Sequence, residues 1–243
     1  LLAAYKLFDH ANNLAKKHFS ISDVKRVEPL QGVMVCNYFF ATYKKPVDEK
    51  NVSQKFDNLN INGQINYNNI KRHISASYRK GKEAHIDMVA LLKANENVAP
   101  IETAKAMVKL GDWYLLFDRR RNAFNAYQDA YGYLVDNKID NEIIESMFGK
   151  PIVLPQLAML NKGIVQEEDF GEIGESQNYV LVSFDVTNYG KPRNVEILES
   201  NPSDNTYMRS KILKSLRRAI LRPRMVAGTP TVTENARLGF ILD

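Results

Sequence analysis

The chain has 243 residues, 44% of them hydrophobic and 25% charged, a composition typical of a globular protein rather than a disordered or fibrous one. Its length permits one large domain or two ordinary ones. The formal net charge of +5 is only mildly basic, and without a nucleic-acid-binding motif it gives no reason to expect a nucleic-acid partner. The single cysteine, Cys36, excludes an intrachain disulfide, and the sequence holds no apolar run long enough to span a bilayer.

The first 150 residues are predicted to be mainly helical. Apolar residues recur at helical spacing in Leu1–Phe19 and again in Val33–Tyr43. Farther along, one pair of helices is expected to meet near Gly81 and a second pair near Asp118–Arg121. Because helix, tight turn and helix repeat along the chain, the pattern indicates an array of α-hairpins.

A polar segment, NLNINGQINYNN (Asn58–Asn69), interrupts these helices with the spacing of a calcium-binding loop. Calcium affinity depends on carboxylate ligands, but the ligand positions here carry neutral amides, including Asn69 where a bidentate Glu is needed. We therefore interpret the segment as a polar turn in which Gly63 supplies a positive φ.

Residues 151–177 are predicted to be a linker, because they contain prolines and the acidic run QEEDFGE. Beyond it the pattern becomes strand-like on both sides of a turn at Asn188–Gly190. The apolar residues that alternate there are Val180, Val182, Phe184, Val186, Val195 and Ile197.

A helix and a last strand complete this second region. Asp204 or Asn205 is the expected N-cap of the helix, and the final alternating strand runs to Leu242. The predicted class is α+β. It comprises an N-terminal α-helical hairpin array in residues 1–150 and a small β-β-α-β domain with an antiparallel sheet in residues 178–243.

The predicted C-terminal helix carries a basic surface formed by Lys211, Lys214, Arg217 and Arg218. Such a cluster can bind phosphates or lipid headgroups. A solvated helix face, with cations near the negative end of the helix dipole, explains the same residues without a ligand. We expect the solvated face.

Small and aromatic residues follow a regular pattern in Ala104–Ala130, at Leu110-Gly111, Tyr114, Ala123, Tyr127 and Ala130. The segment resembles a tetratricopeptide repeat, although Met107 replaces the usual Trp and Val135 stands where a terminal Pro is common. The alternative is an ordinary helical bundle. The resemblance implies a protein-binding groove on the face of the first helix that carries Lys105, Val108, Asp112 and Leu115.

Several short motifs follow the predicted linker: the turn at Gly190, the pair Arg217-Arg218, then Arg222-Pro223 and Gly228-Thr229-Pro230. With these motifs Asn178–Leu242 resembles the C-terminal domain of the TonB family, except that Ala219–Leu221 replace the usual aromatic pair. The resemblance implies a periplasmic domain that binds a partner segment by strand addition at a sheet edge. We expect the last strand to be that edge, with Glu234, Asn235, Ala236, Arg237, Leu238 and Gly239 binding the partner.

Catalytic and metal-binding motifs are missing from the sequence. The four histidines, His10, His18, His73 and His85, lie far apart and form no zinc motif. The sequence also lacks a GxSxG elbow, a Walker-type loop and a GxGxxG turn. We expect no catalytic residues, no metal site and no cofactor.

Both resemblances are to protein-binding modules, so the sequence predicts a non-enzymatic scaffold or adaptor in the periplasm of a Gram-negative bacterium. Its expected partners are cell-envelope proteins, among them a TonB-dependent receptor, with membrane contact only through a partner or a removed anchor. The sequence begins at Leu1 without Met, which favours removal of a signal peptide or anchor. Two alternatives stay open: a TonB-type energy transducer whose anchor is missing from the sequence, and an enzyme on an envelope substrate.

Overall fold

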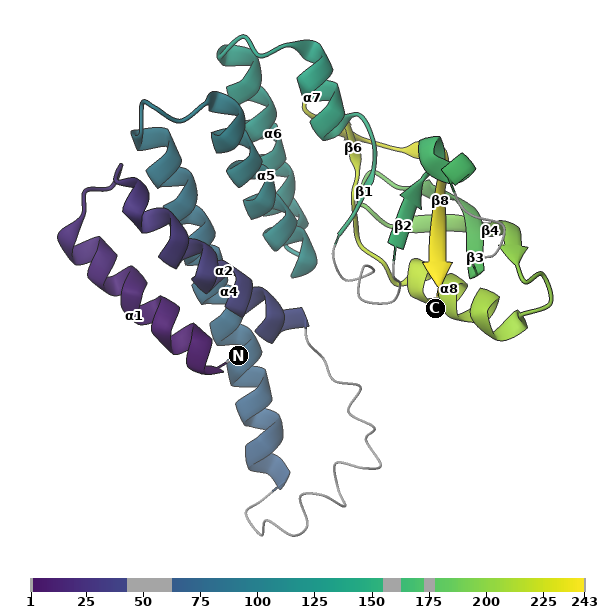
Figure 1. Ribbon diagram of the computed structural model, residues 1–243, viewed down its shortest axis with the longest axis horizontal. Helices are drawn as coiled ribbons and strands as arrows, with labels where there is room; N and C mark the ends of the chain where they lie inside the picture. Colours follow the sequence, from purple (N-terminus) through teal and green to yellow (C-terminus); the bar gives the residue numbers. More distant parts are fainter. Residues whose placement is uncertain (1, 43–62, 155–162, 173–177, 243) are drawn as a thin grey trace. The chain divides into compact units, whose positions relative to one another are not determined.

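The computed structural model describes residues 2–42, 63–154, 163–172 and 178–242 (Figure 1). Proximity between Cα atoms divides the chain into two compact units, residues 1–113 and 114–243. Helices build the first unit, whereas helices and antiparallel sheets build the second. The predicted α+β class, with a helical N-terminal region and a C-terminal sheet, is confirmed.

The first unit consists of helices that share an apolar core. They are α1 (Leu2–His18), α2 (Val27–Thr42), α4 (Gly63–Ala94) and most of α5 (Pro100–Leu116), with the short 3-10 helix η1 (Val24–Arg26) before α2. The buried core residues come from α2, α4 and α5: Leu30, Val33, Ala84, Met88, Leu91 and Ala106. Each of these helices therefore buries one apolar face, which is the main source of its stability.

The helix α4 is continuous through Gly81, so the predicted meeting of two helices at this position is wrong. Gly81 instead allows a close approach, because a Cβ atom built there would lie 2.1 Å from Cζ2 of Trp113. The Trp113 indole Nε1 also donates a hydrogen bond to the carbonyl of Tyr78 at 3.2 Å. The glycine is explained by the packing of an aromatic ring against the helix backbone rather than by a turn.

The polar segment Asn58–Asn69 is only partly described. Asn58–Asn62 lie outside the described residues, whereas Gly63 is the first residue of α4. In its described part the segment is therefore the beginning of a helix, not a turn.

The second unit begins within α5 and continues with α6 (Arg120–Asp136) and α7 (Asn141–Phe148). The predicted break at Asp118–Arg121 is confirmed, because α5 ends at Leu116 and α6 begins at Arg120. Asp118 has a φ of 57°, in the left-handed region that Asp tolerates better than most residues.

A four-stranded antiparallel sheet is the main β structure of this unit, in the order β2-β8-β3-β4. Its strands are β2 (Gly163–Gln166), β3 (Asn178–Val186), β4 (Pro192–Asn201) and β8 (Thr233–Leu242). The predicted turn joins β3 to β4, and Gly190 adopts a φ of 72° there. This turn contacts β5 closely, since Leu221 donates its N–H to the Gly190 carbonyl at 3.0 Å. The glycine thus serves a hairpin turn.

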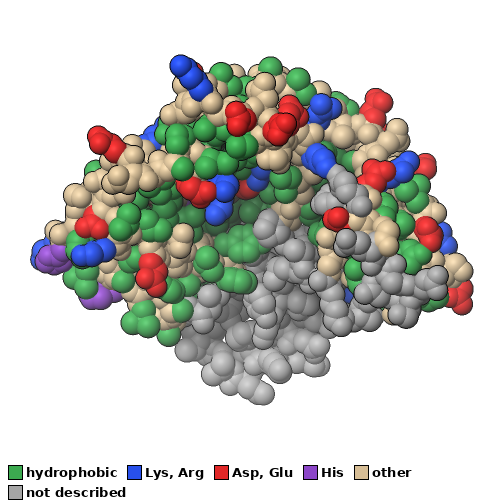
Figure 2. Space-filling model, turned by 45° about the horizontal axis from the view of Figure 1, so that its top comes forward, with side chains coloured by type: hydrophobic (Ala, Val, Ile, Leu, Met, Phe, Trp, Pro, Cys, Tyr) green, Lys and Arg blue, Asp and Glu red, His purple; other side chains and the backbone are tan. Residues whose placement is uncertain are grey.

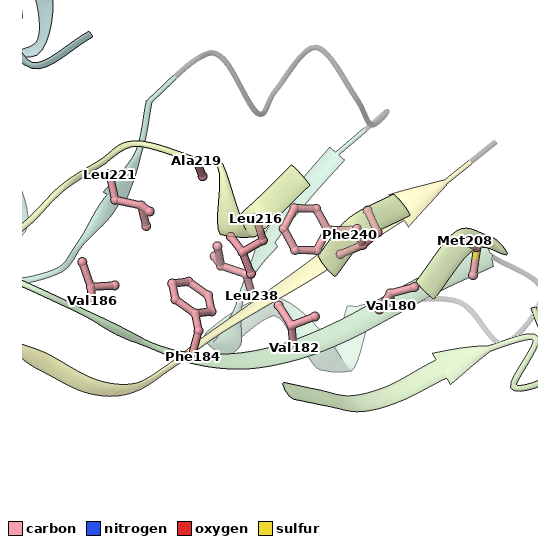
Figure 3. Close-up of a cluster of buried hydrophobic side chains, with 11 residues drawn as sticks. Val180, Val182, Phe184, Val186, Met208, Leu216, Ala219, Leu221, Leu238 and Phe240 are labelled. Atoms are coloured by element: carbon pink, nitrogen blue, oxygen red, sulfur yellow. The ribbon is translucent and has the colours of Figure 1, made fainter. Parts of the chain in front are cut away.

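The helix α8 (Thr206–Arg217) covers one face of this sheet (Figure 1). Asn205 is its N-cap, because the Asn205 side chain accepts a hydrogen bond from Met208 N at 3.0 Å. Apolar side chains of the helix and the sheet point toward one another, among them Leu216 and Phe240 (Figure 3). The predicted β-β-α-β order is therefore present in β3, β4, α8 and β8.

Two short ribbons accompany the main sheet. β1 (Ile152–Val153) pairs with β5 (Leu221–Arg222), and β6 (Arg224–Val226) pairs with β7 (Thr229–Thr231).

Parts of the predicted linker, residues 151–177, form regular structure: β1, β2 and the 3-10 helix η3 (Glu167–Glu172). Its apolar residues Val153 and Ile164 pack against the core of the main sheet, so this segment is part of the fold.

Candidate functional site

The strand β4 is an outer strand of the main sheet. It pairs with β3 on one side and with no other strand of the described residues on the other. Val195 and Ile197 pack against the core, whereas Glu196 and Leu198 are exposed. Since the unpaired side of an outer strand offers backbone donors and acceptors to an extended peptide, β4 is the candidate site for a partner strand.

Two irregularities shape this edge. The pairing of β3 with β4 shifts register between Leu181 and Val182 and again between Ser183 and Asp185. Near the second shift, Asn194 has a φ of 49°. Such bulges twist an edge strand and shorten the straight stretch that another strand can pair with. The site therefore suits a short extended segment better than the flat edge of another sheet.

Asp185 on β3 connects the irregularities on both of its neighbouring strands. One carboxylate oxygen accepts a hydrogen bond from the side chain of Asn194 at 2.6 Å, and the other accepts one from the backbone N–H of Asn235 on β8 at 3.0 Å. These bonds, first from Asn235 and then from Asn194, lower the pKa of Asp185. The ionised carboxylate holds the local geometry of the sheet.

The prediction that the last strand forms the sheet edge is wrong for the half of β8 that contains Leu238 and Gly239. β2 pairs with this half, in the register Ile164 to Phe240 and Gln166 to Leu238. Leu238 and Gly239 are also buried, so they cannot bind a partner in this arrangement.

The other predicted edge residues lie in the preceding half of β8, beyond the register of β2. Glu234 and Asn235 are exposed, and Ala236 is half-buried against the core. The Arg237 guanidinium pairs with Glu167 of η3 at 3.0 Å. Asn235 has a φ of 54°, so the strand bulges there and is a poor template for continuous strand addition.

The predicted groove on α5 is only partly at the surface. Val108 and Leu115 are 3% and 2% exposed, so the prediction that they bind a partner is wrong. They lie seven residues apart and so share one helix face, on which both side chains are buried. Lys105 is exposed and pairs with Glu102 at 2.7 Å, and Asp112 is half-buried.

The predicted basic surface on α8 is at the surface. Lys211, Lys214, Arg217 and Arg218 are all exposed, whereas Met208, Ile212 and Leu216, which follow one another every fourth residue, are buried. On the face shown in Figure 2, charged side chains of both signs are interspersed with hydrophobic ones.

Arg222 joins the sheet region to the helices of the same unit. It is 8% exposed, its guanidinium lies 5.7 Å from the ring centroid of Tyr127 on α6, and Nη1 donates to the carbonyl of Met147 on α7 at 3.3 Å. A planar, permanently charged group can stack and donate at once. The sequence shows Arg222 only as part of the Arg-Pro motif, and neither partner could be identified from it.

The hairpin turn between β3 and β4 also contacts α6. The ring of Tyr189 lies 6.3 Å from that of Phe124, and the Arg120 guanidinium lies 5.7 Å from the Tyr189 ring centroid. The turn that begins the candidate edge strand is therefore held against a helix, a contact that nothing in the local sequence pattern indicates.

His85 is a buried titratable group of the first unit. Burial, and secondarily the nearby Lys109 cation, lowers the pKa of His85 from 6.5 to about 3. Its ring lies 5.2 Å from that of Trp113, and its Nδ1 atom has no hydrogen-bond partner among the described residues. A neutral imidazole packed on an aromatic ring is a core residue rather than an acid or base.

Within the described ranges, no group of His, Cys, Asp and Glu side chains is placed to hold a metal ion. None of the described helices has the length and apolar character needed to cross a membrane.

Comparison of the chain with protein-family models, with curated proteins and with solved structures finds no match.

Proposed function

We propose that the protein is a non-enzymatic adaptor of the cell envelope, located in the periplasm, that binds an extended segment of a partner protein along β4. The observation that carries this proposal is the unpaired outer side of β4 among the described residues. The resemblance of Asn178–Leu242 to the TonB C-terminal domain favours an envelope protein as the partner, with a TonB-dependent receptor as one candidate.

The shape of the edge supports a short partner segment. Between the two register shifts, β4 presents Glu196 to solvent, and Leu198, which lies at the first shift, is 50% exposed. A partner strand beside them would gain backbone hydrogen bonds from the edge and an apolar contact at Leu198. The charged neighbours on β4 discourage self-association, as charges on edge strands commonly do.

Site-specific photo-crosslinking tests the proposal. A photoreactive phenylalanine analogue is placed at Glu196 or Leu198 on β4, at Glu234 on β8, or at Arg121 on α6, four exposed positions. The protein is then illuminated in intact envelopes. We expect one crosslinked species from both β4 positions and none from Arg121.

Competition then distinguishes strand addition from simple proximity. A synthetic peptide that covers the crosslinked segment of the partner should abolish the β4 product, and the same peptide with N-methylated backbone amides should not. Equal labelling from all four positions, or a product that the peptide leaves unchanged, would exclude β4 as the binding edge.

A further inference from the structure

The helix α8 has two chemically distinct faces. Met208, Ile212 and Leu216 point into the core of the sheet. At 100° per residue, the side chains opposite them fall within an arc of about 120°. They are Tyr207, Ser210, Lys211, Lys214, Arg217 and Arg218, here called the outer face of α8.

The positive charge of the outer face is not neutralised within the described part of the chain. The helix itself contains no acidic residue. None of its four outer cations forms an ion pair with a described carboxylate. The acidic 3-10 helix η3 directs Glu167 to Arg237 of β8, not to α8. A cluster of unpaired cations creates a positive potential that attracts an anionic surface.

The helix dipole accounts for only part of this cluster. It favours cations in the last turn, which contains Lys214 and Arg217, and at the C-cap Arg218, and its effect falls off before that turn. Lys211 lies farther from the helix end, so the dipole gives no reason for a cation there. Nor does the dipole account for Tyr207, which is 77% exposed at the start of the helix.

The outer face fits the surface of a lipid bilayer. A convex helix face presents its cations along a line to a plane, and Lys and Arg side chains near anionic headgroups are each attracted to them. Tyrosine is enriched at membrane–water interfaces, because its ring is apolar and its hydroxyl is polar. The phosphate backbone of a nucleic-acid duplex would use the cations but would give the exposed ring of Tyr207 no role.

We propose that the outer face of α8 binds directly to bilayers that contain anionic phospholipids. The contact is peripheral: the apolar side of α8 stays on the sheet while the cations and Tyr207 meet the headgroups. It differs from the expectation that the membrane is reached only through a partner or an anchor. It does not depend on strand addition at β4.

Vesicle co-sedimentation tests this proposal with the whole chain. The protein is mixed with vesicles of phosphatidylcholine alone or of phosphatidylcholine with phosphatidylglycerol. We expect binding only to the second kind, and a decrease as sodium chloride rises and screens the charges. Each basic residue contributes about fivefold in affinity, equivalent to about 1 kcal/mol. The triple variant Lys211→Gln, Lys214→Gln, Arg218→Gln should therefore bind about a hundredfold more weakly.

A matched control carries the same loss of charge at exposed positions elsewhere, Lys6→Gln, Lys17→Gln and Arg121→Gln. It should bind like the unmodified protein. If the α8 triple variant loses its far-UV circular dichroism, the single variant Lys214→Gln replaces it, with an expected loss of about fivefold. Tyr207→Ser should also weaken binding. This loss relative to the unmodified protein should persist when salt is added, because salt screens charges and not the contact of the ring.

Three results would overturn the proposal. The first is equal binding to both kinds of vesicle, and the second is equal weakening by the control and the α8 variant. The third is displacement of the protein from vesicles by duplex DNA at phosphate concentrations matching the lipid, which would identify a general polyanion site.

Discussion

The carboxylate of Asp185 on β3 accepts a hydrogen bond from the backbone N–H of Asn235 on β8 at 3.0 Å. The bond forms where the pairing of the two strands shifts register, and where Asn235 takes a φ of 54°. A bulge leaves backbone groups without a ladder partner. A side chain of the central strand thus satisfies the donor that the bulge of its neighbour leaves free.

This arrangement predicts a pH-dependent stability. The folded state lowers the pKa of Asp185, so its contribution is present above the pKa of the unfolded chain and is lost as pH falls through the lower, folded pKa. Asp185→Ala should lower the Tm at neutral pH, and the difference from the unmodified protein should shrink as the solution is acidified. Asn194→Gly removes one donor without straining the positive φ and leaves the Asn235 N–H, so a smaller effect with the same pH trend is expected. Thermal unfolding followed by circular dichroism at several pH values measures both.

His85 predicts a second pH effect. Burial keeps it neutral in the folded state down to a pH of about 3, whereas the unfolded residue gains a proton near pH 6.5. Stability should therefore decrease as pH falls from about 6.5 toward 3, because only the unfolded state takes up the proton. His85→Leu should remove this part of the pH dependence. Denaturant unfolding followed by Trp113 fluorescence at several pH values measures this difference. An unchanged pH profile of stability in the variant would contradict a neutral, buried His85.

Two glycines in helices provide a matched test of packing. At Gly81 an added Cβ would lie 2.1 Å from the buried Trp113 ring, whereas at Gly132 on α6 it would have no neighbour within 4 Å. Gly81→Ala should lower the free energy of unfolding by about 1–3 kcal/mol through overpacking. Gly132→Ala should raise it by up to about 1 kcal/mol through helix propensity. Urea titration measures both, and equal effects would exclude the close packing of Trp113 on α4.

The contacts of Arg222 with α6 and α7 indicate that this residue stabilises the second unit. Arg222→Ala would leave the Met147 carbonyl without this donor and expose the Tyr127 ring, with an expected loss of about 1–3 kcal/mol in the free energy of unfolding. Arg222→Lys should recover little of it, since an ammonium group cannot stack and donate as the planar guanidinium does. Arg193→Ala, at an exposed position on β4, is the control and should change stability by less than about 0.5 kcal/mol.

Local patterns predicted the features that depend on neighbouring residues. The alternation in β3, the turn at Gly190 and the helix break after Leu116 all follow from periodicity or from residues that tolerate special φ values. The Asn205 cap is also a local feature, because its oxygen reaches only three residues ahead.

Features set by distant contacts were not predictable in this way. A glycine such as Gly81 is typical of a helix break, but here it is explained by the ring of Trp113, which packs against it from another helix. β2 has only 4 residues, too few for alternation to distinguish a strand from a linker. Its position beside β8 makes the last strand an internal one, and that pairing joins residues far apart in sequence. The candidate edge is therefore β4 in the structure, rather than β8 as the sequence predicts.

The sheet order also constrains when the fold can form during synthesis. β2 leaves the ribosome before β3, yet these two strands do not pair with each other, because β8 lies between them. Until residue 242 has been translated and released from the exit tunnel, β2 lacks its pairing strand and β3 lacks one of its two neighbours. A nascent chain stalled before β8 therefore leaves one backbone edge of β3 without its pairing strand, and β8 completes the pairing of the described sheet.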